Sequence, residues 1–379
     1  MVIPVSEPNL DLKDAAAVIE AVRNCQVSGN SKIVQEFEAV FANYIGKSFG
    51  VSCNSGASAL HIALLALGVG EGDEVIVPDL TMIATANAVA YCGATPVFAD
   101  VDEETWCIDP VDVEKKVTSK TVGVIPVHLY GHPCDMDYVG TVADAHGLWI
   151  LEDSAEAIGS EYQGRKCGSI GDASCFSFYA NKNITTGEGG MVVTDDKQVA
   201  DDCRALRSHA FGTKGLLQHF NHTRLGYSYR LSGLQAALGV SQMERIEYLV
   251  SRKCYNGKFY NSFLKPLADE GKLTLPVEKD YAKNTYWYYT ILVNPSYGLS
   301  RDELMQKLLE GGVETRTTFI PMHRQELYKD WHLKTSLKMS NEFPVSDLVA
   351  DRGINLPSSS RLKAEEIMYV CEAIKKHAL

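Results

Sequence analysis

The stretch of residues 73–102, DEVIVPDLTMIATANAVAYCGATPVFADVD, decides the fold of this chain. DEVIVPDL is a short apolar run that predicts a strand, TMIATANAVAYCG has the length of a helix and closes on glycine, and TPVFADVD predicts another strand. Strands that are apolar throughout must be covered on both faces, and strands separated by helices pair in parallel. The stretch therefore predicts an α/β fold.

The same alternation continues on both sides of this stretch. Further strands are predicted at SFGVSC, VGVIPVHLYG, LWILED, SCFSFYA and GGMVVTDD, with helices such as ALHIALLALG and MDYVGTVADAHG between them. Residues 232–270 read as long and helical and lead to a smaller unit, with strands TYWYYTILV and ETRTTFI and helices SRDELMQKLLEGG and KAEEIMYVCEAIKKH. We predict a large domain over residues 1–245 and a small α+β domain over residues 246–379.

Composition narrows the class of partner. The 36 Lys and Arg residues against 48 Asp and Glu residues give a net charge of −12 with no dense basic run, which argues against nucleic acid or an anionic membrane as partner. No apolar run approaches the roughly 18 residues of a membrane span, and the start lacks a signal-peptide pattern. The ten cysteines are scattered without a CxxC pair, as expected of reduced thiols in the cytoplasm.

Ligands of open α/β sheets bind at the carboxyl ends of the strands, and three stretches end strands there. In CNSGASAL, the backbone N–H groups of Gly56, Ala57 and Ser58 can approach a phosphate at a helix N-terminus, although a tight turn that merely needs glycine gives the same pattern. In ILEDSAEAIGS, Asp153 follows a buried strand and needs a cationic or hydrogen-bonding partner. A pyridinium N–H or the cap of the next segment would supply one.

The third stretch, SFYANKNITTGEGGMVV, carries Ser177 and Lys182. Lys182 lies between a buried strand and a glycine-rich loop, with no acidic residue nearer along this stretch than Glu188. Most lysines are surface ion-pair residues, but burial here would lower the pKa of the amine and make it nucleophilic toward a carbonyl. A lysine, a phosphate cradle and a strand-end aspartate in this order indicate a covalent link to pyridoxal phosphate (PLP).

The same stretches resemble the motifs of the DegT/StrS-type sugar aminotransferases, which are fold type I PLP enzymes. The resemblance lies in EDSAEAIGS, GDASCFSFYANKNITTGEGGMVVTDD, GYSYRLSGLQAALG and GVETRTTFIPMH, and it runs from IPVSEPNL to RGINLPSS. It implies a large domain with a mainly parallel seven-stranded sheet and a small C-terminal α+β domain. It also implies a homodimer with a shared active site and transfer of nitrogen from L-glutamate to a nucleotide-linked 4-keto-6-deoxy sugar. VHLYGHPCDMD and RGINLPS favour a GDP-linked mannose derivative aminated at C4.

Residue roles carry over by position. The resemblance makes Lys182 the lysine bonded to the cofactor, Asp153 the partner of its ring nitrogen and Glu156 the neighbour of its ring hydroxyl. Phosphate contacts fall on Ser177, Gly56, Ala57 and Ser58, with Ser228 reaching the partner's site, and the sugar nucleotide is expected near Ser28, Arg316 and His323.

Four positions depart from the family pattern. Met82 stands where an aromatic ring usually covers the cofactor, and Ser228 replaces an asparagine. Ala57 and Gln26 replace threonine and tryptophan. These departures bear on how tightly the cofactor is held.

Alternatives stay open beside this interpretation. The sugar could be dTDP- or UDP-linked and aminated at C3 or C4, or the chain could be a catalytically silent regulator with the same fold. A sister group of dehydratases replaces the lysine with histidine, which Lys182 argues against, and no GxGxxG follows the first strand to support a dinucleotide site. His128 and His132 lie on a strand and loop rather than a helix face, so we expect no metal there, and we expect Tyr286–Tyr289 to pack in the core.

Overall fold

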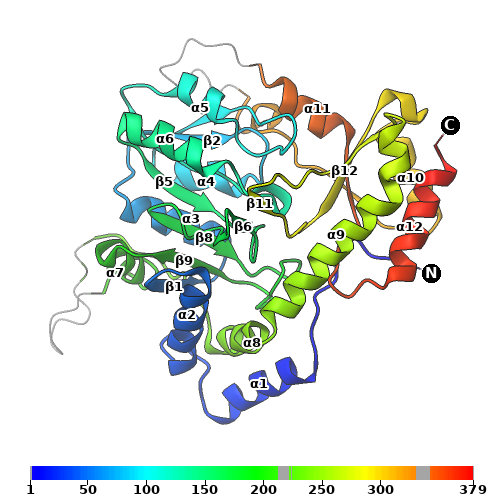
Figure 1. The fold of residues 1–379 in the computed structure, drawn as a ribbon. Coiled ribbons are helices and arrows are strands. Elements are labelled where there is room, and N and C mark those ends of the chain that lie inside the picture. The colour runs from blue at the N-terminus through cyan, green and yellow to red at the C-terminus, as the bar shows by residue number, and fades with distance from the viewer. Residues whose placement is uncertain (1, 212–221, 223, 330–341, 379) are drawn as a thin grey trace.

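A seven-stranded sheet forms the centre of the computed structural model, which describes residues 2–211, 222, 224–329 and 342–378 (Figure 1). Its strands are β1 (Phe49–Cys53), β2 (Glu74–Pro78), β3 (Thr95–Ala99), β4 (Thr121–Val124), β5 (Trp149–Asp153), β8 (Ala173–Ser177) and β9 (Gly190–Thr194), in the order β1-β9-β8-β5-β4-β2-β3. β3, β2, β4, β5 and β8 pair in parallel, whereas β9 is antiparallel to both neighbours. The mainly parallel sheet predicted from the sequence is confirmed.

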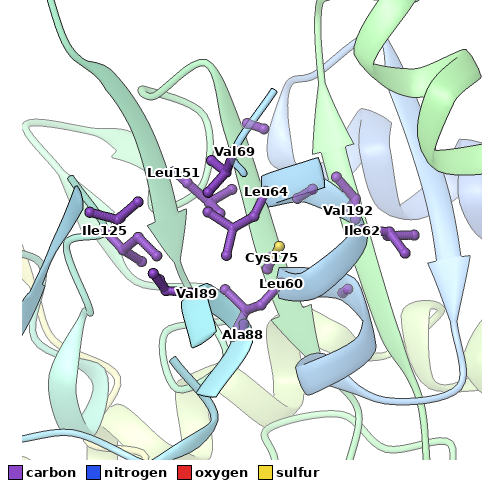
Figure 2. Close-up of a cluster of buried hydrophobic side chains, with 14 of the residues drawn as sticks. Leu60, Ile62, Leu64, Val69, Ala88, Val89, Ile125, Leu151, Cys175 and Val192 are labelled. Carbon is purple, nitrogen blue, oxygen red and sulfur yellow. The ribbon is translucent and has the colours of Figure 1, made fainter. Parts of the chain in front are cut away.

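Helices cover both faces of this sheet, as uninterrupted apolar strands require. Successive side chains point to opposite faces, so Val75 and Val77 join one core and Ile76 the other. α3 (Gly56–Ala66), α4 (Ala84–Tyr91) and α7 (Lys197–Leu206) cover the first face, where Figure 2 shows Leu64 and Leu151 among the packed side chains. The opposite face is covered by α2 (Lys32–Ile45), α5 (Pro110–Lys116), α6 (Met136–His146), α8 (Gly233–Met243) and α9 (Ile246–Asp269).

A four-stranded antiparallel sheet forms the smaller unit. Its strands are β10 (Leu273–Thr274), β12 (Tyr289–Val293), β14 (Gly353–Leu356) and β13 (Arg316–Thr317), in that order. α10 (Arg301–Glu310), α11 (Pro344–Arg352) and α12 (Ala364–Lys376) pack around it, and α9 runs from α8 to lie beside α12 (Figure 1). The remaining elements are α1 (Leu12–Arg23), the strands β6 (Glu161–Tyr162), β7 (Arg165–Lys166) and β11 (Ala282–Lys283), and the short 3-10 turns η1 (Leu129–Gly131), η3 (Pro295–Tyr297) and η4 (Met322–Arg324).

The start of the chain pairs with the smaller unit. The amide of Ile3 donates to the carbonyl of Gly312 at 2.8 Å, and the amide of Glu314 donates back to Ile3 at 2.9 Å. Ile3 is fully buried in the core of the small sheet. Ile3 therefore packs with the smaller unit, whereas Val5 joins a core of the large sheet. A boundary between α8 and α9 stays our proposal.

Three predicted elements come out differently. The helical segment over 232–270 is two helices, α8 and α9, because the chain turns at Arg245, whose guanidinium bonds Asp14 of α1 at 2.7 Å. The strand predicted at TYWYYTILV begins only at Tyr289, because Tyr286 takes a φ of 50° that no regular strand allows. ETRTTFI pairs only at β13.

Two sequence expectations about the chain as a whole can be compared with the structure. Over the described part of the chain, no helix combines the length and the apolar character that a bilayer crossing needs. All ten cysteines are free thiols, and Cys25 is exposed whereas the others are buried or half-buried.

Candidate active site

A cavity of about 370 Å³ lies where the carboxyl ends of the large sheet meet the smaller unit. β5 contributes Asp153, β8 contributes Ser177, and the loop after β8 contributes Lys182. Arg316 of β13 and Asn355 of β14 line the cavity from the small sheet. The position at the strand ends is the one expected of ligand sites in α/β sheets.

One end of the cavity is built by the first turn of α3. Gly56 and Ala57 lie in this turn, where N–H groups lack partners within the helix and the helix dipole attracts an anion. A Cβ added to Gly56 would lie 3.0 Å from the Cβ of Ser177, so a glycine lets the turn approach β8 this closely. Gly56, Ala57 and Ser177 all line the cavity, and their role as phosphate ligands stays a proposal.

Ser58, the fourth residue predicted at this end, needs correction. Its amide bonds the hydroxyl of Ser55 at 3.1 Å, and its own hydroxyl donates to Asn54 at 2.6 Å. Because both groups serve the cap of α3, Ser58 is not among the lining residues, and Ser55 lines the cavity instead. A cap residue and a ligand residue have the same local sequence signature, which is why the sequence could not separate them.

Asp153 ends β5 with its carboxylate almost fully buried. One oxygen accepts the hydroxyl of Thr85 at 2.8 Å and the other accepts the amide of Ala155 at 3.1 Å. Burial raises the pKa of Asp153, and these two bonds together with the charge of Lys182 only partly offset it. A cationic N–H placed in the cavity would stabilise the ionised carboxylate.

Lys182 extends into the cavity with its side chain 10% exposed. Its Nζ lies 3.9 Å from Oε1 of Glu156 and 3.6 Å from the centre of the Trp287 ring. Burial lowers the pKa of Lys182, against the raising effect of the carboxylates of Glu156 and Asp153. Lys182 therefore has a nearby acidic partner, Glu156, which comes from the loop after β5.

Glu156, which faces Lys182, is held in place by a backbone hydrogen bond. Its Oε2 accepts the amide of Tyr130 at 2.9 Å, and Tyr130 has an unusual φ of 53°. The Tyr130 hydroxyl in turn accepts the amide of Phe319 from the smaller unit at 3.2 Å. Burial raises the pKa of Glu156 to about 7 despite the nearby charge of Lys182. Both shifts bring the pair closer to its neutral form, in which Lys182 is uncharged and Glu156 is protonated.

A buried histidine–carboxylate hydrogen bond behind the cavity supports the end of β5. Glu152 accepts Nε2–H of His128 at 3.0 Å and the amides of Gly168, Ile170 and Gly171 at 2.7, 2.7 and 2.6 Å. Burial alone would raise the pKa of Glu152, but these donors lower it. The described residues hold no cluster of three or more His, Cys, Asp or Glu side chains suited to a metal, and His128 is committed to this structural bond.

The predicted substrate residues divide into two groups. Arg316 lines the cavity and donates to the hydroxyl of Tyr288 at 3.4 Å. His323 does not line it, because Nδ1 bonds Asp79 at 2.7 Å and Nε2 lies 3.2 Å from Asp347. Its partner Asp79 is fully buried at the end of β2. His323 therefore joins the small unit to the large sheet, and a contact with substrate stays unsupported.

Ser28 and Ser228 also lie outside the cavity, and both are exposed. The hydroxyl of Ser28 accepts the amide of Asn30 at 3.2 Å, and that of Ser228 accepts Arg230 at 3.3 Å. Neither serine lines the cavity of its own chain. Met82 does line the cavity, with 49% of its surface exposed.

The cavity has an aromatic wall that was not predicted from the sequence. Trp287 and Tyr288 line it, whereas Tyr286 and Tyr289 pack in the core of the small sheet. Asn181 joins this wall by donating to the Tyr288 hydroxyl at 3.1 Å. Trp287 and Tyr288 both lie before β12 and directly after the positive φ of Tyr286, and no pattern in the sequence signals that turn.

Known proteins match this chain over almost its whole length. The sequence profile of the DegT/DnrJ/EryC1/StrS aminotransferase family matches residues 8–375. A GDP-perosamine synthase of Escherichia coli O157:H7 is 40% identical over 99% of this chain and 98% of its own, and one of Caulobacter vibrioides is 39% identical over 98% and 97%. The PLP form of the sugar aminotransferase Spr1654 of Streptococcus pneumoniae superposes with a TM-score of 0.90 at 27% identity, over 100% of this chain and 99% of that one.

Proposed function

The chain belongs to the DegT/DnrJ/EryC1/StrS aminotransferase family, and on that premise we propose that it moves the amino group of L-glutamate to C4 of GDP-4-keto-6-deoxymannose, forming GDP-perosamine. It is a PLP-dependent sugar aminotransferase. The observation that carries the choice of substrate is the 40% identity to a GDP-perosamine synthase across nearly the full chain, with Lys182 and Asp153 both lining the cavity. The product would feed synthesis of O-antigen or another surface polysaccharide.

The residues of the cavity fit PLP. Gly56, Ala57 and Ser177 form an anion cradle too narrow for a side chain at position 56, which suits a phosphate. Asp153 would hold the ring nitrogen, Glu156 the ring hydroxyl, and Lys182 the aldehyde carbon. When bound, PLP withdraws electrons from the bonds at the donor's α-carbon.

The side chains of this chain supply the proton transfers. Because burial lowers the pKa of Lys182, more of its amine is uncharged near neutral pH, and an uncharged Nζ can attack a carbonyl or accept a proton from the α-carbon of glutamate. Oε1 of Glu156, 3.9 Å away, can hold a proton beside that amine. Asp153 would stay anionic if a protonated ring nitrogen lay opposite it. The same groups act in reverse when the keto sugar takes up the nitrogen.

A homodimer is the proposed assembly. Ser228 belongs to GYSYR, the motif that the family resemblance assigns to the partner's phosphate site, and its exposed position outside the cavity of its own chain supports that assignment. Light scattering on the purified protein tests the dimer. Mixing Lys182→Ala and Ser228→Trp chains, each inactive alone, should restore activity if the site is shared.

We place the enzyme in the cytoplasm, because ten free thiols suit a reducing compartment.

A product assay tests the substrate. The purified protein is incubated with L-glutamate and GDP-4-keto-6-deoxymannose, and dTDP- and UDP-linked 4-keto and 3-keto sugars serve as competitors. Mass spectrometry should show the GDP-linked amine forming at least about 10-fold faster, the discrimination that a few lost polar contacts produce. Faster amination of a dTDP or UDP sugar would overturn the GDP assignment. If no sugar is aminated while PLP stays bound, the chain is a silent member of the family.

A further inference from the structure

The ring of Trp287 forms one wall of the Lys182 environment. Trp287 is 4% exposed, and Nζ of Lys182 lies 3.6 Å from its ring centre. An ammonium over the face of an indole is attracted by the ring quadrupole, and the attraction grows when water is excluded. The contact joins the two units of the chain, because Lys182 follows β8 whereas Trp287 precedes β12.

Trp287 is held by hydrogen bonds at its ring nitrogen and at its backbone carbonyl. Its Nε1–H donates to the carbonyl of Asn181, the residue before Lys182, at 2.9 Å. The carbonyl of Trp287 accepts Nζ of Lys253 at 2.7 Å, and Lys253 is itself 3% exposed on α9. The amide of Asn181 bonds the neighbouring Tyr288 hydroxyl at 3.1 Å. The ring therefore cannot move away from the lysine without breaking bonds to the lysine's own loop.

Charged groups face Lys182 from every side of the cavity. Glu156 and Asp153 approach it from the large sheet and favour its charged form. Lys253 opposes them from α9, and Arg316 lines the same cavity from β13. Trp287 carries no net charge, so its face attracts the ammonium without offering a site for the proton. Its effect on the amine can thus be separated from that of the carboxylates.

We propose that Trp287 is a positioning residue for Lys182. The indole face of Trp287 holds the free amine beside the cavity whenever that amine is not bonded to the cofactor. The ring raises the basicity of Nζ and limits its positions during proton transfer. This role rests on transamination by Lys182 but not on the identity of the sugar. The test therefore measures the pKa of Lys182 in the absence of substrate.

Competitive labelling of the full-length apoenzyme with acetic anhydride at a series of pH values gives the pKa of Lys182, with the modified peptide followed by mass spectrometry. Trp287→Leu removes the ring and keeps an apolar wall, so the pKa of Lys182 should fall by about half to one pH unit. Trp287→Phe keeps a weaker face and should give an intermediate value. Trp106→Phe changes a second buried tryptophan that does not line the cavity, so it is the matched control and should leave the pKa unchanged.

Fluorinated tryptophan tests the same contact without changing its shape. Fluorine weakens the negative face of the indole, so uniform replacement of the 4 tryptophans should lower the pKa of Lys182 in the native sequence and not in Trp287→Phe. In the loaded enzyme, kcat should fall about 10-fold in Trp287→Leu, the KM for glutamate should change little, and Trp287→Phe should recover much of the rate. Equal Lys182 pKa values in the native, Phe and fluorinated proteins would overturn the proposal even if the Leu variant failed to fold.

Discussion

Lys182 and Lys253 are both buried, and burial lowers the pKa of both, but their surroundings differ. Lys253 donates to the carbonyl oxygens of Trp287 and Ser358 in a closed core. Lys182 extends into a cavity, with a carboxylate 3.9 Å away and a ring face at 3.6 Å. The first amine serves structure, and the second remains available to react.

The difference teaches that burial alone does not make a lysine reactive. Desolvation makes an amine less basic wherever it occurs. Strong bonds to carbonyl oxygens then fix the amine of Lys253, whereas the longer contacts of Lys182 leave its lone pair accessible once the proton is lost. Variants of each site can break or sharpen this contrast.

Removing the reactive amine should have the largest effect. Lys182→Ala should lower turnover at least about 10⁴-fold, because both covalent attack and proton transfer depend on Nζ. Steady-state assays measure the loss, and thermal unfolding should show an intact fold. Lys265→Ala, an exposed lysine on α9, is the control and should keep full activity. More than a hundredth of the native rate in Lys182→Ala would show that the reaction does not need this amine.

The next largest effect is expected at Asp153, the carboxylate that ends β5. Asp153→Ala should cost about 10²- to 10³-fold in kcat, because the cofactor's ring nitrogen would lose its anionic partner. Asp153→Glu should retain more activity than the alanine variant. Native turnover in Asp153→Ala would remove the aspartate from the chemistry.

Removing the buried amine of Lys253 should lower the free energy of unfolding. Lys253→Met leaves two buried carbonyl groups without their donor and should cost about 2 kcal/mol in urea unfolding at pH 6. The pKa of Lys253 is lowered by burial to about 7 in the folded chain, against about 10.4 when unfolded. Between these values the unfolded chain binds more protons, so the native protein should gain stability as pH rises from 7 to 9, by at most about 1.4 kcal/mol per pH unit. The methionine variant should lack this slope, and an identical slope in both proteins would contradict the assignment.

The smallest effect is expected from Glu156→Gln in the apoenzyme. Burial raises the pKa of Glu156 to about 7, so its contribution to stability is fully present below its unfolded value near pH 4.3 and is lost as pH rises through 7. Glutamine should remove that decline, which is at most about 2.5 kcal/mol between pH 5 and 7.5. Urea midpoints at the two pH values measure it. The same decline in both proteins would mean that Glu156 ionises normally.

Much of the large sheet could be predicted from the sequence, because its strands are uninterrupted apolar runs between helices. The break between α8 and α9 could not, because the turn at Arg245 depends on a bond to Asp14 from the other end of the domain. Distant contacts of this kind leave no periodicity in the local sequence. The same holds for His323, which pairs with Asp79 across 244 residues.

Site residues that end or follow a strand could be predicted from the sequence, whereas site residues from distant segments of the chain could not. Asp153, Ser177 and Lys182 each follow or end an apolar run, so their place at the sheet edge could be inferred. Trp287 reaches the cavity because Tyr286 adopts a positive φ. Such a backbone conformation is uncommon for tyrosine, so the sequence does not predict it. Ser58 was misassigned because capping and ligand binding use the same small polar residues.

Lys182 and the ring that covers it leave the ribosome at different times. Synthesis runs from the N-terminus, so Asp153, Glu156 and Lys182 are exposed to the cell before Trp287 has been made. Until the C-terminal unit docks, the amine lacks the ring that helps to exclude water from it. The full desolvation that lowers the pKa of Lys182 therefore comes only with the finished chain.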